Sequence, residues 1–240
     1  MYKGEKINVI MPVYNEEKTV GGIVDRVLKQ DCVGRLIVID DSKDRSMDIL
    51  RKKKAKDRRI TLLHNERPMG KGNALVRGIK SVKSGLILIQ DADEEYFPED
   101  YPKLLRALAN GRAVYGTRML GRNLGHQYRL ARVGNELMSL SFSLFFHKKL
   151  TDINTCYKLF RREMLDPDKL KKRDFIIEEE MSIHFVRNGF DIVEVPIRYK
   201  GRTFEEGKKI NAMHGFSGLF YIIKEGVKYA FAFEGAPGRR

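Results

Sequence analysis

The chain has 240 residues, of which 42% are hydrophobic, so it can bury one sizeable core but has little room for two full domains. Its two cysteines lie far apart, which excludes a disulfide framework and metal-ligand spacing and favours reduced thiols in a cytosolic protein. The formal net charge of +14 predicts a polyanionic partner, either nucleic acid, anionic lipid or a phosphorylated substrate.

In the first half of the chain, apolar strand patterns alternate with helical ones. Strands are predicted at 7–11, 36–39, 60–63, 86–89 and 113–115. Helical spacing of apolar residues predicts a helix at 20–28 behind the candidate cap Asn15, another after Gly72, and a third after Pro98 that Asn110 and Gly111 end. This alternation predicts an α/β fold whose mainly parallel sheet has helices on both faces.

The second half is more apolar and aromatic. Residues 137–146 carry no charge, and an apolar stripe runs along one helical face from Phe216 to Phe231. Either these helices pack on the sheet, or one or both lie in a membrane interface with the aromatic side down. No apolar run approaches the roughly 20 residues of a spanning helix, and the N-terminus lacks a signal-peptide pattern, so we expect a soluble or peripheral protein.

Carboxylates follow three of the predicted strands. Glu16 follows the first strand, Asp41 the second, and Asp91 and Asp93 the fourth. Because the carboxyl ends of parallel strands share one edge of the sheet, where open α/β sheets bind ligands, we expect a site there. Asp91 and Asp93, with Glu95 as a further candidate, offer the oxygen ligands that suit Mg²⁺ or Mn²⁺ shared with substrate phosphates.

The glycines of the stretch GKG (70–72) stand where a helix is predicted to begin. The full phosphate-loop pattern is absent, so the stretch either lies near a nucleotide or forms a plain tight turn.

Longer stretches resemble the inverting family-2 glycosyltransferases of the GT-A fold, in the branch of dolichol-phosphate mannose and glucose synthases. The resemblance spans about residues 7–210 and is carried by MPVYNEE (11–17), IVIDDS (37–42), GKGNA (70–74), IQDADEEYFPEDYPKL (89–104), YGTR (115–118), TDINTCYKLFRRE (151–163), FIIEEE (175–180) and VPIRYKGRTFEEGKKI (195–210). It implies a Rossmann-like GT-A domain at 1–212, to which we add a C-terminal amphipathic helix at 213–234 and a disordered tail at 235–240.

The resemblance also implies an activity. It is the inverting transfer of a hexose from a nucleotide-diphosphate sugar to a polyprenyl phosphate, dolichyl or undecaprenyl, at the cytoplasmic membrane surface. Mg²⁺ or Mn²⁺ is the implied cofactor. Likeness to the glucose-type branch favours a UDP-sugar over GDP-mannose. Since the chain has no spanning run, we expect peripheral attachment to the inner face of the membrane, and a membrane-anchoring partner stays open.

Site residues are implied position by position. Donor base and ribose positions are matched by Pro12, Tyr14, Glu16 and Asp41; the diphosphate and metal site by Asp91, Asp93 and Glu95; and the closing basic loop by Arg202 and Lys208. The acceptor side is matched by Arg118, Asp152, Lys158, Glu178 and Glu180, and both Arg129 and Arg132 fit the acceptor-phosphate arginine. The candidate catalytic residues are Asp93, Arg202 and Arg118. The family's glycine after Asp41 is missing here, because Ser42 follows directly.

The chemistry of the acceptor separates the alternatives. A phosphate monoester, with its second pKa of about 6, is largely dianionic at neutral pH and needs positioning by Arg and Lys but no general base. A soluble family-2 transferase acting on a saccharide or protein hydroxyl would need a base, for which Glu178 and Glu180 are candidates. A basic nucleic-acid-binding protein would need basic residues interleaved with exposed aromatics, and the sequence shows no such module, so we expect no nucleic-acid partner.

Overall fold

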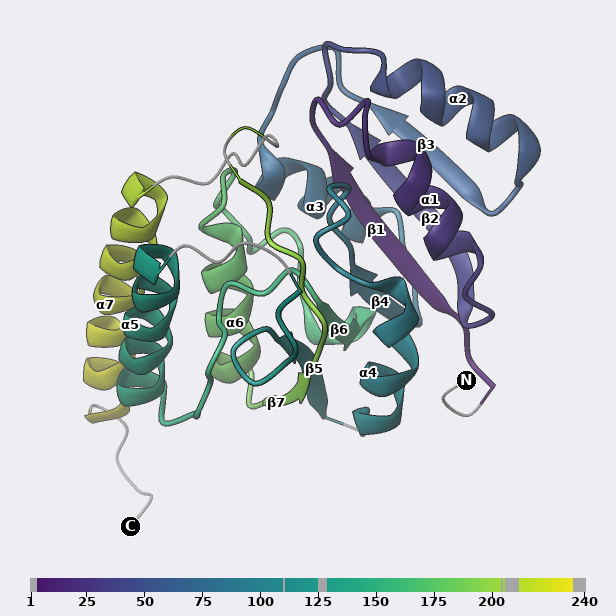
Figure 1. The fold of residues 1–240 in the computed structure, drawn as a ribbon. Helices are drawn as coiled ribbons and strands as arrows, with labels where there is room; N and C mark the ends of the chain where they lie inside the picture. The colour runs from purple at the N-terminus through teal and green to yellow at the C-terminus, as the bar shows by residue number, and fades with distance from the viewer. Residues whose placement is uncertain (1–3, 110, 125–128, 204, 206–211, 235–240) are drawn as a thin grey trace.

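The computed structural model describes residues 4–109, 111–124, 129–203, 205 and 212–234. Across these residues runs a seven-stranded sheet of order β3-β2-β1-β4-β6-β5-β7 (Figure 1). Its strands are β1 (Ile7–Val13), β2 (Val33–Asp40), β3 (Ile60–His64), β4 (Leu86–Ile89), β5 (Arg112–Thr117), β6 (Lys158–Arg161) and β7 (Asp191–Pro196). The five predicted strands are confirmed, and β6 and β7 are additions to them.

Strand β6 interrupts an otherwise parallel sheet. It runs antiparallel to both β4 and β5, whereas every other pairing among the described strands is parallel. The mainly parallel sheet is therefore confirmed. Since β6 lies between β4 and β5, it separates the β1–β4 part of the sheet from the part formed by β5 and β7.

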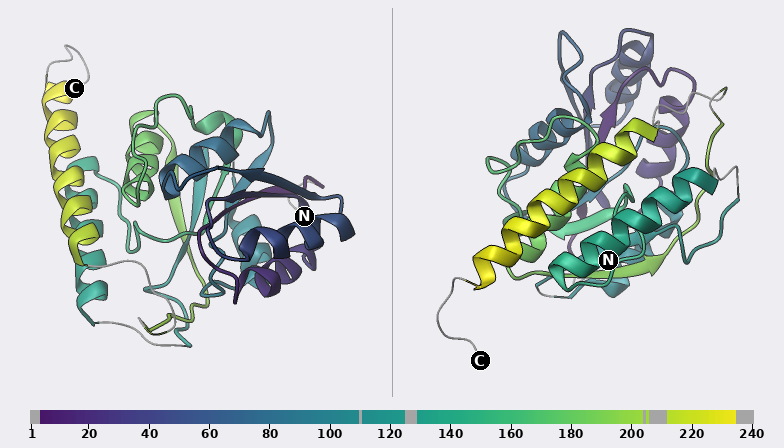
Figure 2. Two further views of the ribbon diagram at one scale, coloured as in Figure 1. Left: turned by 90° about the horizontal axis from the view of Figure 1, so that it is seen from above. Right: turned by 90° about the vertical axis from the view of Figure 1, so that its left-hand side faces the viewer.

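Helices cover both faces of the sheet, as predicted (Figure 2). One face carries α1 (Val20–Leu28), α2 (Ser46–Lys56) and α4 (Tyr101–Ala107), and the other carries α3 (Lys71–Lys80) and α6 (Ile177–Arg187). Short 3₁₀ helices, η1 (Pro98–Asp100) and η2 (Arg162–Met164), complete the connections. Apolar strand residues such as Val9, Ile37 and Leu88 are buried between these layers, and both cysteines are free and buried.

The prediction that Asn15 caps the first helix is wrong. The N-cap of α1 is Thr19. Asn15 instead has a positive φ of 51°, and its Oδ1 accepts a hydrogen bond from the backbone N–H of Lys43 at 2.8 Å. Asn15 lies too far before the N-cap to serve the helix, and its side chain instead closes a turn against the loop after β2.

Helices α5 (Arg129–Phe146) and α7 (Ala212–Glu234) run side by side in the same direction and form an outer layer (Figures 1 and 2). Glycines on α7 allow the close approach. A Cβ at Gly226 would lie 2.4 Å from the ring of Phe145, and one at Gly218 would lie 2.3 Å from Oε1 of Glu179 on α6. The predicted C-terminal helix is thus present, while the predicted tail at 235–240 lies outside the described residues.

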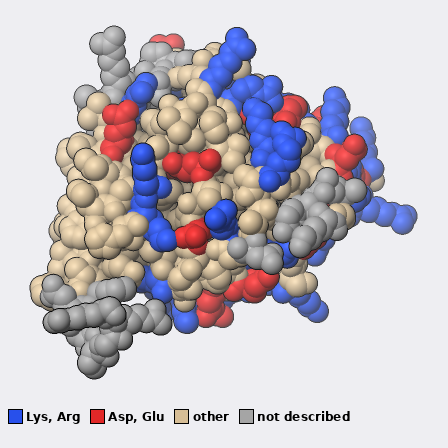
Figure 3. Space-filling view, turned by 90° about the horizontal axis from the view of Figure 1, so that it is seen from below, with Lys and Arg blue, Asp and Glu red and all other residues tan. Residues whose placement is uncertain are grey.

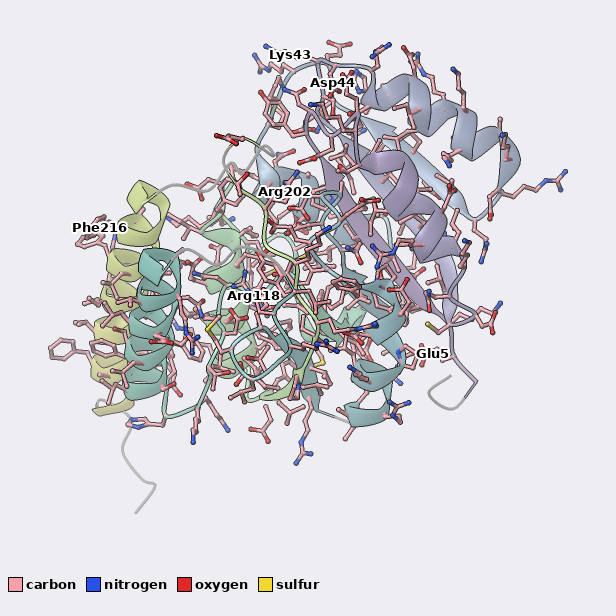
Figure 4. The ribbon with its side chains drawn as sticks, viewed as in Figure 1. Glu5, Lys43, Asp44, Arg118, Arg202 and Phe216 are labelled. Atoms are coloured by element: carbon pink, nitrogen blue, oxygen red, sulfur yellow. The ribbon has the colours of Figure 1, made fainter. Side chains whose placement is uncertain are left out.

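The outer side of this helix pair is an exposed apolar face. On α7, Phe216, Phe220 and Phe231 are each at least 70% exposed, and Phe216 projects away from the molecule in Figure 4. The apolar face comprises Val133, Leu137, Leu140, Leu144, Phe216, Phe220, Ile223, Val227 and Phe231. Packing within the fold is therefore confirmed for the inner sides of these helices, and their place in a membrane interface stays a prediction. Among the described residues no helix is both long and apolar enough to cross a membrane.

Basic residues are spread over the one face of the molecule that Figure 3 shows. On the face shown in Figure 3, Lys and Arg side chains are interspersed with Asp and Glu and do not form one continuous stripe. The high net charge of the sequence is thus not concentrated on this face in the way that nucleic-acid grooves concentrate it.

Candidate active site

The carboxyl ends of β1, β2 and β4 meet at one edge of the sheet, as predicted. Strand β1 pairs with β2 on one side and with β4 on the other. Glu16 therefore lies between Asp41, which follows β2, and the stretch from Asp91 to Glu95, which follows β4. Pro12 lies near the end of β1, and Tyr14 just beyond it is 42% exposed. We call this edge the donor edge.

The turn after β2 is well formed without the family's glycine. The hydroxyl of Ser42 accepts a hydrogen bond from the backbone N–H of Asn15 at 2.8 Å, which ties the loop after β2 to the loop after β1. Asp41 is buried, and its carboxylate accepts hydrogen bonds from the Asn65 amide at 2.5 Å and from the backbone N–H of Met69 at 2.9 Å. Asp41 thus stays at the donor edge despite the departure.

Three carboxylates of the donor edge converge on one guanidinium, that of Arg202. Its Nη1 lies 3.1 Å from Oε2 of Glu16, its Nη2 lies 3.0 Å from Oδ2 of Asp93, and its Nε lies 3.7 Å from Oε1 of Glu95. Burial, together with the charges of Glu95 and Asp91, raises the pKa of Asp93 to about 8, although Arg202 opposes the shift. The cluster therefore carries more negative charge than one arginine neutralises.

The strand-like segment that carries Arg202 is held against Glu95. The backbone N–H of Arg202 donates to Oε1 of Glu95 at 2.8 Å, and the hydroxyl of Tyr199 donates to Oε2 at 2.6 Å. The ring of Tyr199 lies beneath the guanidinium of Arg118, 5.2 Å from its centroid. Tyr199 thus contacts both the donor edge and the predicted acceptor side. Sequence analysis did not single it out, and its only signal is its place inside the stretch 195–210.

Asp91 has a different partner, Lys71 at the start of α3. The Nζ of Lys71 lies 2.9 Å from Oδ1 of Asp91 and 2.9 Å from Oε1 of Glu178. Burial opposes the charged form of Lys71, but these two carboxylates raise its pKa well above the ordinary value. Sequence analysis treated Lys71 only as the middle of a glycine turn, and the structure makes it part of the site.

The glycines of this turn serve close backbone packing. A Cβ at Gly72 would lie 2.3 Å from the carbonyl oxygen of Lys172, and Gly70 has a φ of 88°. The carbonyl of Arg173 accepts the backbone N–H groups of Gly72 at 2.8 Å and of Asn73 at 3.3 Å. Because these N–H groups at the helix N-terminus already have a partner, the tight-turn reading is favoured over a phosphate loop.

The residues predicted to bind a metal provide suitable ligands, but cationic side chains hold them here. Within the described part of the chain, no three His, Cys, Asp or Glu residues are arranged to hold a metal ion. Lys71 pairs with Asp91, and Arg202 pairs with Asp93 and Glu95. The all-oxygen donor set and the raised pKa of Asp93 nevertheless fit a hard divalent cation such as Mg²⁺ or Mn²⁺, which would relieve the repulsion between these carboxylates.

On the predicted acceptor side, Arg118 forms a buried bidentate pair with Asp152. Its Nε lies 2.8 Å from Oδ2 and its Nη2 2.7 Å from Oδ1. Burial opposes the charge, but Asp152 raises the pKa of Arg118 well above its ordinary value. Asp152 is itself held by Glu194, whose Oε1 accepts its backbone N–H at 2.9 Å. The arrangement keeps a permanent cation beside the end of β5.

The other predicted basic residues are less central in the structure. Arg132 pairs with Glu136 at 2.9 Å on the exposed side of α5. Arg129 is the first residue of α5, and its side chain lies outside the described part, as does Lys208 entirely. The structure therefore brings together Glu16, Asp93, Glu95 and Arg202, with Arg118 joined to them through Tyr199.

Glu178 and Glu180, the candidate bases, are engaged within the fold. Glu180 accepts the backbone N–H groups of Lys171 and Lys172, each at 2.9 Å. Glu178 lies 2.6 Å from Nζ of Lys158 as well as near Lys71. These contacts favour pairing within the fold over proton transfer for both residues.

Comparison with known proteins gives concordant results. The sequence profile of the family described as "Glycosyl transferase family 2" matches residues 8–167. A dolichyl-phosphate hexose transferase of Haloferax volcanii is 27% identical over 207 residues, covering 85% of this chain and 87% of the relative. An undecaprenyl-phosphate mannosyltransferase of Micrococcus luteus is 28% identical over 224 residues, covering 88% and 90%.

Among solved structures, glucosyl-3-phosphoglycerate synthase from Mycobacterium tuberculosis, in complex with Mn²⁺, UDP-glucose and phosphoglyceric acid, superposes with a TM-score of 0.68. It is 20% identical and covers 92% of this chain and 81% of that one. At this identity the likeness shows the fold alone, and the expected GT-A architecture is confirmed.

Proposed function

Because the chain belongs to glycosyl transferase family 2, we propose that it transfers a hexose from a nucleoside diphosphate sugar to a polyprenyl phosphate at a membrane surface. The observation that carries the proposal is the donor edge, where carboxylates from two strand ends surround Arg202 and, through Tyr199, adjoin the buried Arg118–Asp152 pair. The names of the two sequence relatives support a polyprenyl phosphate as the acceptor class.

On the donor side, Asp41 and Glu16, with Pro12 and Tyr14, would hold the base and ribose. Asp91, Asp93 and Glu95 would hold Mg²⁺ or Mn²⁺, and the bound ion would stabilise the negative charge that develops on the leaving diphosphate. Arg202 and Lys208 would bind diphosphate oxygens when the carboxylates hold the metal instead of Arg202. We favour a uridine over a guanosine donor.

On the acceptor side, an attacking phosphate oxygen requires positioning and no base. Arg118 lies over the ring of Tyr199, and Glu95 accepts hydrogen bonds from both Tyr199 and Arg202. Arg118 and Arg202 would bind the acceptor phosphate, with Arg129 and Arg132 as further candidates. A phosphate oxygen forms the new bond to the anomeric carbon as the bond to the diphosphate breaks, and the nucleoside diphosphate leaves. One displacement inverts the anomeric centre. The internal pairing of Glu178 and Glu180 supports this acceptor over a hydroxyl.

Membrane attachment would use the apolar face of α5 and α7. Lysines flank that face at the end of α5 and along α7, namely Lys148, Lys149, Lys224 and Lys228. Each basic residue near an anionic leaflet contributes on the order of 1 kcal/mol, and buried aromatic side chains add to this. We propose reversible, peripheral binding on the cytoplasmic side, where nucleotide sugars are available.

The test is sugar transfer from radiolabelled UDP- and GDP-sugars into an organic-extractable lipid, with a short polyprenyl phosphate and Mg²⁺ or Mn²⁺. We expect label in the lipid phase that depends on the metal and is lost in Asp93→Ala. The matched control is Asp48→Ala, which removes a carboxylate exposed on α2 and should leave transfer unchanged.

Each other outcome has a distinct meaning. Label on water-soluble glycosides without label in the lipid would show that the acceptor is a hydroxyl and not a polyprenyl phosphate. Glu178 and Glu180 would then again be candidates for the general base. Absence of turnover for any nucleotide sugar would refute the proposed activity.

A further inference from the structure

A chain of alternating charges runs through the interior from the donor edge to the acceptor side. It begins at Asp91, continues through Lys71 and Glu178, and ends at Lys158. Successive charged groups lie 2.9 Å, 2.9 Å and 2.6 Å apart. We call these four residues the buried charge chain.

Lys158, the last residue of the buried charge chain, is bound to the backbone of segment 152–155, which we call the acceptor loop. Lys158 has no exposed surface, and its three ammonium protons have three partners. These are the Glu178 carboxylate at 2.6 Å, the carbonyl of Ile153 at 3.0 Å and the carbonyl of Thr155 at 2.6 Å. The Lys158 ammonium group thus holds the backbone of the acceptor loop and at the same time contacts Glu178, which pairs with Lys71. The same segment contains Asp152, the partner of Arg118.

The sheet explains why such a link is placed here. Strand β4 leads to the metal-site carboxylates, β5 leads to Arg118, and the antiparallel β6, which begins at Lys158, lies between them. No backbone hydrogen bonds join β4 directly to β5 among the described pairings. The side chains of the buried charge chain therefore provide a link between the β4 side and the β5 side of the sheet.

Core packing alone does not account for these residues. Burying charges costs several kcal/mol per ion, and replacing a buried ion pair by apolar residues of similar volume is often neutral or stabilising. A fully buried position in a central strand, such as 158 beside Tyr115, would ordinarily hold an apolar side chain. The charges therefore require a reason other than stability.

We propose that Lys71, Glu178 and Lys158 are positioning residues that hold Asp91 of the metal–donor site in register with the acceptor loop 152–155. The inference rests on the proposed function and deepens it. Lys71 orients the Asp91 carboxylate, Glu178 orients Lys71, and Lys158 fixes Glu178 against the loop. A change at Lys158, which belongs to the acceptor side, accordingly alters binding at the donor edge.

The experiment measures binding of Mn²⁺ with UDP, and of Mn²⁺ with GDP, to the full chain by isothermal titration calorimetry without acceptor. Lys158→Met keeps an unbranched side chain that is one atom shorter and removes the charge. Glu178→Gln keeps the shape and removes the charge. We expect each to weaken binding of the preferred nucleotide about tenfold, the scale of coupling between residues in one network. Circular dichroism and the thermal midpoint establish that each variant is folded.

The matched control is Tyr115→Phe. It removes a buried hydroxyl that bonds Ser182 at 2.8 Å beside Lys158, and it leaves the charges intact. We expect this variant to lose thermal stability but to bind the nucleotide within twofold of the unsubstituted protein. A purely structural role for Lys158 would instead make affinity follow the thermal midpoint in all three variants.

The outcomes separate the inference from its premise. If Glu178→Gln folds and binds Mn²⁺ with nucleotide as the unsubstituted protein does, the positioning role is overturned while the proposed function stands. The same holds for Lys158→Met if it folds, and Glu178→Gln decides alone if it does not. If the unsubstituted protein binds neither nucleotide with Mn²⁺, the proposed function fails and this inference falls with it.

Discussion

Nη2 of Arg202 lies 3.0 Å from Oδ2 of Asp93, so the protein's own cation occupies a carboxylate that is proposed to bind a metal. The same guanidinium also reaches Glu16, a proposed donor contact, at 3.1 Å. To hold a divalent ion alone, these carboxylates would have to release Arg202. With a nucleotide diphosphate bound as well, phosphate oxygens would offer Arg202 a replacement partner. The contact thus favours joint binding of metal and donor.

Arg202→Gln should therefore change two properties in opposite directions. Without nucleotide, affinity for Mn²⁺ should rise about three- to tenfold, because a competing positive charge is removed from the carboxylates. Transfer should fall about 10²–10³-fold, the usual effect of removing one group that stabilises developing charge. Electron paramagnetic resonance of free Mn²⁺ measures the first quantity. Arg198→Gln is the control, since Arg198 pairs with Asp100 at 3.0 Å; unchanged or weaker Mn²⁺ binding in Arg202→Gln would contradict the displacement argument.

Gly72→Ala should destabilise the fold by about 1–3 kcal/mol, the range for forcing an extra carbon into a packed site. A Cβ there would lie 2.3 Å from the carbonyl of Lys172, and neither backbone segment is free to yield. Transfer should also fall, because α3 would shift Lys71 away from Asp91. Urea unfolding measures the first effect. In Gly134→Ala, where an added Cβ has no neighbour within 4 Å, the same substitution within α5 should be neutral or stabilising by up to about 1 kcal/mol.

Glu179 should make stability depend on pH. Burial, with a further contribution from the Glu178 carboxylate and against the opposing effect of Lys158, raises the pKa of Glu179 from 4.5 to about 7. Between these values the folded protein keeps a proton that the unfolded chain releases, so its contribution to stability is complete below pH about 4.5 and is lost as pH rises through 7. The loss is about 3 kcal/mol.

Glu179→Gln should remove this dependence, and its free energy of unfolding by urea should exceed that of the unsubstituted protein at pH 8 more than at pH 5. Glu163→Gln, at an exposed position, should leave the slope unchanged. Equal slopes for the unsubstituted protein and Glu179→Gln would show that the raised pKa of Glu179 does not govern stability.

The apolar face should control membrane binding. Phe220 and Phe231 are 70% and 71% exposed, and transferring each ring to the membrane interface should contribute roughly tenfold in affinity. The double variant Phe220→Ser/Phe231→Ser should bind vesicles of phosphatidylcholine and phosphatidylglycerol about a hundredfold more weakly in co-sedimentation. Leu120→Ser removes a side chain that is 62% exposed outside the face and should have little effect. If the double variant instead changes oligomeric state and keeps vesicle binding, the face joins copies of the chain.

The sequence predicted those parts of the molecule in which one local pattern determines the structure. Continuous apolar runs identified β1, β2, β4 and β5, because both faces of these strands are largely buried. The edge strand β3 is only partly buried, and it was predicted from the mostly apolar stretch 60–63. Strand β6 has only four residues with Lys158 and Arg161 at its ends, and β7 is a partly exposed edge strand, so neither carries such a run. Their pairing depends on residues far away in the chain.

The site divides in the same way. The carboxylates at strand ends were predictable from strand position alone. Arg202 entered through family resemblance, since no periodicity brings residue 202 to the ends of β1 and β4. Lys71 was not predicted as a site residue, because the flanking glycines indicate only a turn of the backbone. Its ammonium group contacts Asp91 and Glu178, which lie 20 and 107 residues further along the chain.

The central place of β6 also constrains how the protein can be synthesised. Strand β4, with the sequence LILI, pairs with β1 on one edge and with β6, which is synthesised later, on the other. Because chains emerge N-terminus first, the β1–β4 unit can form on the ribosome while that second edge remains open. An open apolar edge is a template for intermolecular pairing. Fragments that end before Lys158 should therefore aggregate, and the second edge of β4 is covered only after β6 has emerged.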